Sequence, residues 1–232
     1  MGRITREIKF VAAADRADRA LAILSHYTAP DPDHDEGTIE SIYLDDTPLS
    51  SFNEKTAGHH LKRKIRLRWY IEGPAAADGR RTAFLEVKDR IGGGRDKARH
   101  AMAVPSDWIA AVPLHDPDLL RLFREGARAA GLRLPADAAP TVSIRYARRR
   151  FVCPRTQDRL CLDTRIRTTR TNGDRLPYAD AGEWGVAVCE VKGEDPAFGP
   201  WAEDLVRAGF RARSFSKYGA AIAGALHPGV SA

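Results

Sequence analysis

Apolar and polar residues alternate along much of this chain, as they do in β-strands that have one face in a core. Residues 64–69, with the sequence Lys-Ile-Arg-Leu-Arg-Trp, show the alternation most clearly. Together with flanking turn residues, the pattern predicts strands at residues 5–11, 38–45, 62–71, 84–90, 97–104, 141–152, 159–170 and 185–192. Three glycines at 92–94 follow the strand at 84–90, so this strand and the next one are expected to form a hairpin.

Apolar residues that recur with helical spacing predict helices at residues 15–27, 106–112, 116–131 and 200–209. The helix at 116–131 has Asp116 as its expected cap, Pro117 at its first position and Gly131 as its stop. Asp15 is the expected cap of the first helix. The last helix is expected to turn inward the side chains of Trp201, Leu205 and Val206. Residues 28–37 and 174–183 are predicted loops, and residues 214–222 predict a short element whose type the pattern leaves open.

The chain has 232 residues, of which 43% are apolar, and this is enough to bury the core of one domain spanning residues 1–232. No apolar run reaches the length of a membrane span, and the first residues lack the apolar segment of a secretion signal. We therefore expect a cytoplasmic protein. Cys153, Cys161 and Cys189 show no Cys-x-x-Cys spacing, so reduced thiols are expected in place of a disulfide framework or structural zinc.

The polar faces of the expected strands are unusually rich in ionised residues. Glu86 and Lys88 share one face of their strand, and Glu190 and Lys192 share one face of another. A solvated sheet face explains any single strand of this kind. So many ionised faces together, in a chain of net charge +6, favour an α+β fold in which an antiparallel β-barrel tunnel of about eight strands has a charged lumen. Its apolar outside would then be covered by the predicted helices.

A lumen lined with like charges is costly unless a counter-ion fills it. Arginine and lysine match phosphate oxygens in charge and geometry, so a polyphosphate or a nucleoside triphosphate is the natural counter-ion. The interspersed carboxylates would repel phosphate, but they are hard oxygen ligands suited to Mg²⁺ or Mn²⁺. Both signs of charge in one lumen therefore predict a metal–triphosphate site.

At this point the residues match a known family. The chain resembles the VTC-type polyphosphate polymerase domain of the triphosphate tunnel metalloenzyme, or CYTH-like, superfamily. The matching segments are EIKF at 7–10, SIYLD at 41–45, KIRLRWY at 64–70, FLEVK at 84–88, KAR at 97–99, YAR at 146–148, RLCLDT at 159–164, CEVK at 189–192 and SFSKY at 214–218. They occur in family order and span nearly the whole chain.

The resemblance implies an ATP-dependent polyphosphate polymerase that transfers the γ-phosphate of ATP to a growing polyphosphate chain, with Mn²⁺ or Mg²⁺. The implied phosphate-binding residues are Lys9, Arg66, Arg68, Lys88, Lys97, Tyr146, Arg148, Arg159, Lys192, Ser216 and Lys217. The implied catalytic residues among these are Arg66, Arg68, Lys88, Arg148, Lys192 and Lys217. The implied metal ligands are Glu190 first, then Glu86 and Glu7.

One difference from the motifs of the superfamily affects the expected reaction. Hydrolytic branches of the superfamily begin their first strand with Glu-x-Glu-x-Lys, and Thr5 stands here at the first Glu position. This favours the polymerase branch, while a tunnel-type triphosphatase or polyphosphatase and a non-catalytic polyphosphate-binding module stay open as alternatives. The preferred metal, the acceptor, the chain length and the oligomeric state also stay open. The regulatory sensor and membrane anchor of eukaryotic relatives do not fit in this chain, so a separate membrane partner is expected to serve any export.

Other motifs point to no competing function. The glycine-rich residues 91–95 do not match the Walker A spacing of a P-loop. His59 and His60 are expected in an exposed loop. The three arginines at 148–150 have no aromatic platform beside them in the sequence, so no nucleic-acid partner is expected.

Overall fold

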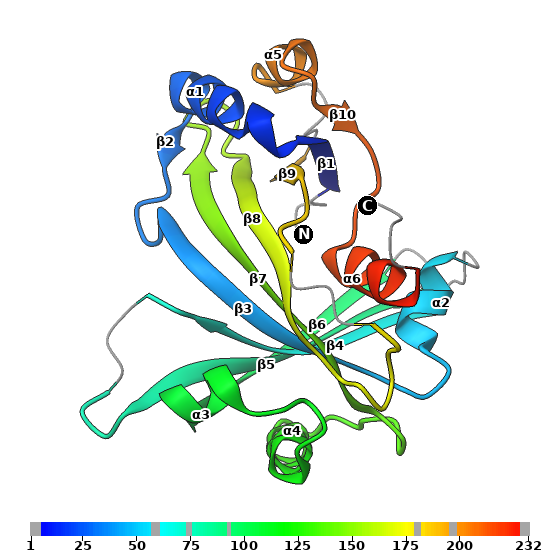
Figure 1. Cartoon of the computed structure of the whole chain (residues 1–232). Helices are drawn as coiled ribbons and strands as arrows, with labels where there is room; N and C mark the ends of the chain where they lie inside the picture. The colour runs from blue at the N-terminus through cyan, green and yellow to red at the C-terminus, as the bar shows by residue number, and fades with distance from the viewer. Residues whose placement is uncertain are drawn as a thin grey trace.

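A curved antiparallel sheet forms the centre of the computed structural model, which describes residues 6–56, 61–72, 76–91, 94–178, 182–194 and 199–227 (Figure 1). The side chains of residues 54–56, 61, 62, 90, 91 and 94–96 are also outside the description. The strands are β1 (Arg6–Ala13), β2 (Ala29–Pro30), β3 (Glu36–Asp45), β4 (Leu61–Tyr70), β5 (Arg80–Ile91), β6 (Gly94–Pro105), β7 (Ala139–Val152), β8 (Arg159–Thr171), β9 (Val186–Gly193) and β10 (Arg211–Ala212).

The strands lie in the order β10-β1-β9-β8-β7-β3-β4-β5-β6, with β2 paired to β7. Within the described ranges no backbone pairing joins β6 to β10 or β1, so the sheet is open where we predicted a closed barrel, and it has ten strands where we predicted about eight. The α+β class holds. The expected hairpin is confirmed, because β5 and β6 pair from Arg80↔Pro105 to Ile91↔Gly94.

Helices cover the outer face of the sheet at two places. The helices are α1 (Ala17–Tyr27), preceded by the 3-10 turn η1 (Ala14–Arg16), then α2 (Ser50–Thr56), α3 (Ser106–Ala111), α4 (Pro117–Ala129), α5 (Ala202–Arg207) and α6 (Lys217–Leu226). Helices α3 and α4 pack on the apolar residues of β4 and β5, such as Leu67 and Leu85. Helices α1 and α5 pack on β1, β8 and β9 around Leu160 and Cys189. The predicted helical cover of the apolar outside is confirmed.

Helix α6 differs from these because it packs on the inner face of the sheet, within its curve (Figure 1). Tyr218 and Ile222 of α6 bury against Tyr43, Val142 and Ile144, which belong to β3 and β7. Residues 214–222, whose type the sequence pattern left open, thus lead into a helix that fills part of the space enclosed by the sheet.

The predicted helix boundaries held at one helix and failed at another. Asp116 caps α4 by accepting a hydrogen bond from the backbone N–H of Asp118 at 2.8 Å, and Gly131 follows the helix with a φ of +67°. Asp15 does not cap α1, because it lies within η1 and α1 begins after it without a side-chain cap. Val206 on α5 is 44% exposed and does not face the core as predicted, since Leu205 and Trp201 already fill that side.

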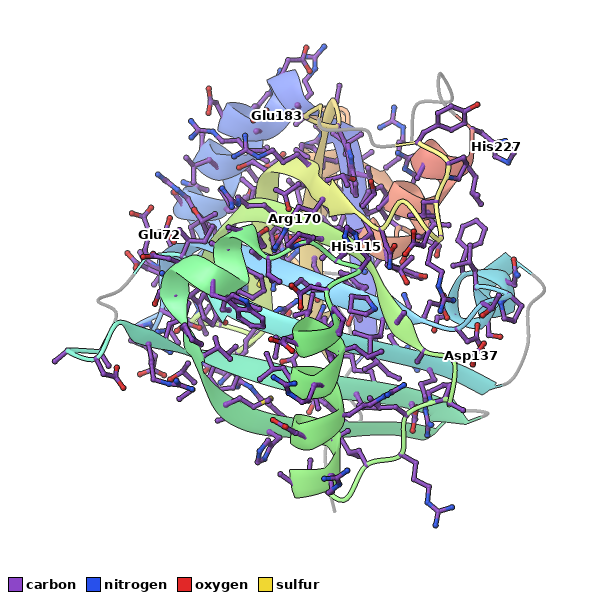
Figure 2. All side chains as sticks on the ribbon, turned by 60° about the horizontal axis from the view of Figure 1, so that its bottom comes forward. Glu72, His115, Asp137, Arg170, Glu183 and His227 are labelled. Carbon is purple, nitrogen blue, oxygen red and sulfur yellow. The ribbon has the colours of Figure 1, made fainter. Side chains whose placement is uncertain are left out.

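One charged cluster belongs to the outer face and serves the packing of a helix. Glu40 of β3 is 1% exposed and accepts hydrogen bonds from Ser143 and Arg145 of β7. Arg170 of β8 pairs with Glu40 at 3.5 Å and donates to the carbonyl oxygens at the end of α3, where Figure 2 shows it. These charges therefore tie α3 to the sheet and do not face the inner space.

Candidate phosphate-binding cavity

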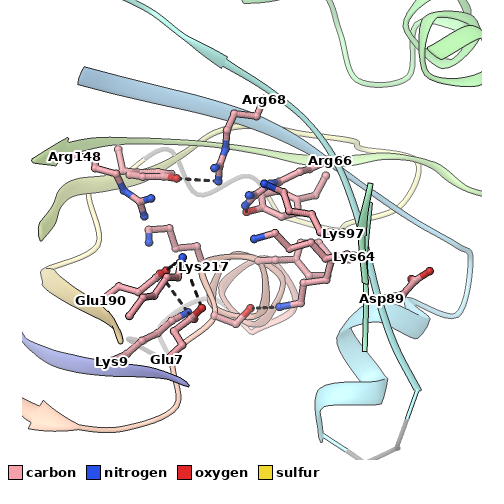
Figure 3. A pocket seen from close by; sticks show the side chains of 16 residues that line it. Glu7, Lys9, Lys64, Arg66, Arg68, Asp89, Lys97, Arg148, Glu190 and Lys217 are labelled. Atoms are coloured by element: carbon pink, nitrogen blue, oxygen red, sulfur yellow. Dashed lines mark hydrogen bonds and ion pairs between the residues drawn. The ribbon is translucent and has the colours of Figure 1, made fainter. Parts of the chain in front are cut away.

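The inner face of the sheet and the start of α6 enclose a cavity of about 540 Å³ (Figure 3). Its cationic lining residues are Lys9, Lys64, Arg66, Arg68, Lys88, Lys97, Arg148, Lys192 and Lys217. Its other lining residues are Glu7, Asp89, Glu190, Tyr43, Tyr146, Ser216 and Tyr218. The volume lies in the range of small-molecule sites, and cations outnumber carboxylates in its wall by three to one. The arrangement is suited to a compact polyanion.

The structure brings together most of the residues that the sequence singled out. Of the implied phosphate-binding residues, all but Arg159 line the cavity. Arg159 is exposed at the start of β8, opposite Lys192, and lies outside the lining. Lys64, Tyr43, Asp89 and Tyr218 line the cavity without having been assigned a role. Lys64 had a signal in the sequence, since it shares its strand face with Arg66 and Arg68.

Glu86 of β5 holds two arginines from behind the cavity surface. It stands opposite Arg66 in the β4–β5 register and accepts hydrogen bonds from Arg66 Nε at 2.8 Å and Nη2 at 2.5 Å. Arg68 lies 3.9 Å away and Lys97 3.5 Å away, while Glu86 itself is 3% exposed. Burial alone would raise the pKa of Glu86, but Arg66 and Arg68 lower it to about 2. The carboxylate is therefore an ionised anchor for arginines, set apart from Glu190 and Glu7 on β9 and β1.

Asp163 of β8 has the same relation to two other cations, and the sequence analysis gave it no role. Arg148 donates to Oδ1 through Nε at 2.6 Å and to Oδ2 through Nη2 at 2.7 Å, and Lys217 Nζ donates to the same Oδ2 at 2.5 Å. Its side chain is fully buried. Burial would raise the pKa of Asp163, whereas Arg148 and Lys217 lower it to about 2. One carboxylate thus joins the sheet wall to the first residue of α6.

Glu190 and Glu7 form a corner of the cavity where strands β9 and β1 pair. Glu190 lies 2.7 Å from Lys192 and 3.8 Å from Lys9, and Glu7 lies 3.5 Å from Lys9 and 3.8 Å from Lys192 (Figure 3). Burial would raise the pKa of Glu190, but Lys192, with Arg148 and Lys9, holds it well below its usual range. Glu190 is therefore ionised at neutral pH, and the carboxylates of Glu190 and Glu7 face the same two lysines.

This corner fits a divalent cation that arrives with phosphate. In the part of the chain that the structure describes, no cluster of three or more Asp, Glu, His or Cys side chains could hold a metal alone. Mg²⁺ is commonly held by one or two carboxylates together with substrate phosphate oxygens, and the pair of Glu190 and Glu7 supplies that number. His59 and His60 lie outside the described residues.

The crowding of cations in the cavity lowers the pKa values of a tyrosine and a lysine. Burial would raise the pKa of Tyr43, but Arg66, which donates to its hydroxyl at 3.3 Å, and Arg68 lower it to about 7. Desolvation by the cavity walls and repulsion by Arg66 lower the pKa of Lys88 to about 8. An anion bound between these groups would reduce the repulsion among the cations. The electrostatics of the empty cavity therefore favour anion binding.

The start of α6 closes one side of the cavity through polar contacts. Ser216 caps the helix by accepting from the backbone N–H of Gly219 at 3.2 Å, and it also contacts Lys64 Nζ at 3.0 Å. Lys9 donates to the carbonyl oxygen of Phe215 at 3.0 Å. Tyr218 donates to the buried carboxylate of Asp45. The helix is therefore fixed to both walls of the curved sheet.

A curved antiparallel sheet whose inner face carries a cavity lined with arginine and lysine is typical of a phosphate-tunnel type of fold. The comparisons with known proteins agree. The model of the VTC domain matches residues 4–226, so the chain belongs to the VTC domain family, a family of triphosphate and polyphosphate tunnels. Family membership points to triphosphate or polyphosphate as the ligand and to use of a divalent metal.

Three solved structures are similar to this chain. A protein of Bacillus halodurans with a provisional assignment as an adenylate cyclase has a TM-score of 0.53 and 14% identity, covering 93% of this chain and 96% of its own. A provisionally assigned adenylate cyclase of Vibrio parahaemolyticus has a TM-score of 0.43 and 12% identity, covering 93% and 96%. A protein of Pyrococcus horikoshii has a TM-score of 0.42 and 14% identity, covering 90% and 95%. The likeness to the protein of Bacillus halodurans supports the fold alone.

Among proteins with curated functions, none matches the chain. In the described residues, no helix combines the length and apolar character needed to cross a membrane.

Proposed function

We propose that this protein is an ATP-dependent polyphosphate polymerase, which transfers the γ-phosphate of ATP to the end of a polyphosphate chain. The observation that carries the proposal is the convergence of lysines and arginines from β1, β4, β5, β6, β7, β9 and α6 on one cavity. A phosphate acceptor and a phosphate donor are both polyanions, and one cation-lined cavity can hold the two together. Membership of the VTC domain family supports the same reaction.

The residues of the chain would act by position and charge. Phosphoryl transfer needs the attacking and leaving oxygens in line and the charge on the transferred group stabilised, with little covalent work from the protein. Arg66, Arg68 and Arg148 present planar guanidinium groups already held by Glu86, Tyr146 and Asp163. Donors held in this way need little reorganisation as charge develops in the transition state.

The lysines and the acidic corner complete the assignment. Lys88, Lys97, Lys192 and Lys217 would neutralise the phosphate chain along the cavity. Glu190 and Glu7 would hold Mg²⁺ or Mn²⁺ together with phosphate oxygens. When bound, such a cation would neutralise charge on the phosphate oxygens and orient the leaving group.

Product analysis with a matched pair of variants tests the proposal. The protein is incubated with ATP and Mn²⁺ or Mg²⁺, and ADP, free phosphate and long-chain polyphosphate are measured together. We expect ADP and polymer in equal phosphate equivalents. Arg68→Ala should abolish polymer, because Arg68 is 12% exposed in the cavity wall, whereas Arg149→Ala should keep it, because Arg149 is 52% exposed on the other face of β7.

The same assay separates the alternatives. Free phosphate without polymer would identify a tunnel-type triphosphatase or polyphosphatase. Tight binding of tripolyphosphate without any turnover, in the presence of either metal, would identify a non-catalytic polyphosphate-binding module. Polymer from Arg68→Ala at the parent yield and with matched folding would refute the assignment of this cavity as the active site.

A further inference from the structure

One row of cavity-lining residues on β4 and another on β7 extend beyond the cavity, and the next residues of the two rows are in contact. On the inner face of β4, Arg66 and Arg68 are followed by Tyr70, and on the inner face of β7, Arg148 is followed by Arg150. Alternate residues of a strand share one face and lie about 6–7 Å apart. Tyr70 and Arg150 therefore each lie one step beyond an arginine of the cavity wall.

Tyr70 and Arg150 touch, and His34 joins them from the loop before β3. Arg150 Nη2 lies 3.4 Å from the Tyr70 hydroxyl, and Arg150 Nη1 donates to the His34 carbonyl oxygen at 3.3 Å. The Arg150 guanidinium lies 5.4 Å from the centre of the Tyr70 ring. The His34 and Tyr70 rings are nearly parallel at 27°, with 6.5 Å between their centres. We call Tyr70, Arg150 and His34 the aromatic cluster.

The surroundings of Gly37 show that the aromatic cluster lies next to the cavity wall. Gly37 of β3 stands opposite Arg148 in the β3–β7 register. A Cβ at Gly37 would lie 3.8 Å from Cδ1 of Tyr70, so the tyrosine ring lies against this part of the strand. The ring is thus beside the backbone that faces a phosphate-binding arginine.

We propose that the aromatic cluster binds the nucleobase of a nucleoside triphosphate whose phosphates occupy the cavity. The inference rests on the proposed function, which makes a nucleoside triphosphate the phosphate donor. Flat rings and an arginine plane are the groups on which proteins stack nucleobases. Tyr70 and Arg150 are the next residues on the strand faces that carry Arg68 and Arg148 of the cavity wall. The half-buried Tyr70 supplies a fixed ring and the exposed His34 an accessible one.

Stacking predicts a particular kind of selectivity. Every base has a π-face, so a stacking site accepts all of them and discriminates little by sequence. The aromatic cluster should therefore distinguish a nucleotide from inorganic tripolyphosphate, which has no base, but should hardly distinguish ATP from GTP.

Binding measurements with the three ligands test the inference. Dissociation constants for ATP, GTP and inorganic tripolyphosphate are measured by calorimetry for the parent, Tyr70→Leu, Tyr70→Phe, His34→Ala and a control, Tyr178→Leu, whose tyrosine is 51% exposed and does not line the cavity. Tyr70→Leu should weaken ATP and GTP binding about five- to a hundredfold and leave tripolyphosphate binding within about twofold. Tyr70→Phe and the control should match the parent, and His34→Ala should weaken nucleotide binding alone.

Each other result overturns the inference. Equal weakening of ATP and tripolyphosphate would make Tyr70 a support of the phosphate cavity, and no change in either would remove the base site. If Tyr70→Leu does not fold, the ratio of ATP to tripolyphosphate affinity in His34→Ala decides, because His34 is exposed. A parent protein that binds tripolyphosphate and not ATP would overturn this inference and the polymerase proposal but keep the anion cavity. A parent that binds none of the three would overturn the cavity as well.

Discussion

Replacing Asp163 by asparagine should destabilise the empty protein and make it more dependent on its anionic ligand. The carboxylate is fully buried and is the shared partner of Arg148 and Lys217. Asparagine keeps the shape and can still accept a hydrogen bond, but it removes the negative charge that Arg148 and Lys217 both contact. Two positive groups would then face each other in a low-dielectric wall.

Two estimates give the size of the loss. Removing one partner of a buried ion pair costs about 3–5 kcal/mol. Independently, Arg148 and Lys217 hold the pKa of Asp163 at about 2 against an ordinary 3.8, which corresponds to about 2 kcal/mol of stability. This contribution is complete above the ordinary pKa and is lost as the pH falls through the folded value. A loss of about 2–5 kcal/mol lowers the melting temperature of a chain of this size by roughly 4–20 °C.

Tripolyphosphate should partly reverse this loss. A ligand present at a hundredfold excess over its Kd stabilises the folded state by about 2.7 kcal/mol, and each tenfold gain in affinity adds about 1.4 kcal/mol. Because a bound phosphate replaces the missing negative charge beside Arg148 and Lys217, Asp163→Asn should show the larger thermal shift at equal ligand concentration. Scanning calorimetry with tripolyphosphate, and with chloride at equal ionic strength, measures both effects.

Glu36→Gln is the control, because Glu36 forms an exposed ion pair with another arginine of β7 and does not line the cavity. Glu36 lies 3.5 Å from Arg149, and the side chains of Glu36 and Arg149 are 65% and 52% exposed. Its loss should cost about 1 kcal/mol or less. The reasoning is refuted if Asp163→Asn melts within the range of the control, or if tripolyphosphate stabilises it no more than the parent.

Three further results are expected. Glu190→Gln should fold and bind tripolyphosphate but lose about 10–100-fold in turnover together with its metal dependence; parent turnover across a Mn²⁺ titration would remove the metal assignment. Arg66→Lys should keep part of the binding and lose most of the polymer yield, because lysine keeps the charge without the planar fork; equal yields would show that charge alone suffices. Between about pH 6 and 9, tripolyphosphate affinity should fall, because Tyr43, with its pKa of about 7, gains negative charge and Lys88, with its pKa of about 8, loses its proton. Over the same range the empty protein should become more stable, since the unfolded chain binds more protons there; Tyr43→Phe with Lys88→Arg should flatten both pH dependences.

The strand faces could be predicted because alternation is a local property. The row of Lys64, Arg66 and Arg68 is visible in six residues of sequence, and its lumen-facing direction follows from the apolar residues between its members. For the same reason the outer apolar faces and the helices that cover them were identified. Twelve of the residues assigned to the site from the sequence line one cavity.

What the sequence did not reveal depends on pairings between distant segments. Whether β6 pairs with β10 depends on the twist and register of the whole sheet. The alternation of apolar and polar residues along each strand gives no information on either. The contacts of Asp163 with Lys217 and of Lys64 with Ser216 join residues 54 and 152 positions apart. Helix α2 has few apolar residues in its seven and forms where β3 ends, with Asp45 and Asp46 accepting from the N–H groups of Ser51 and Ser50.

The carboxylates of the inner face divide into two groups that their sequence positions do not separate. Glu86 and Asp163 are almost completely buried, and each binds an arginine through two nitrogen atoms. Glu190 and Glu7 reach the cavity surface beside Lys9 and Lys192. Neither Glu86 nor Asp163 lines the cavity, but each fixes an arginine that does. Donors fixed in advance cost no reorganisation when charge develops. Under the proposed function, the buried carboxylates would therefore make the cationic wall complementary to a transferring phosphoryl group, while Glu190 and Glu7 would bind the metal that accompanies it.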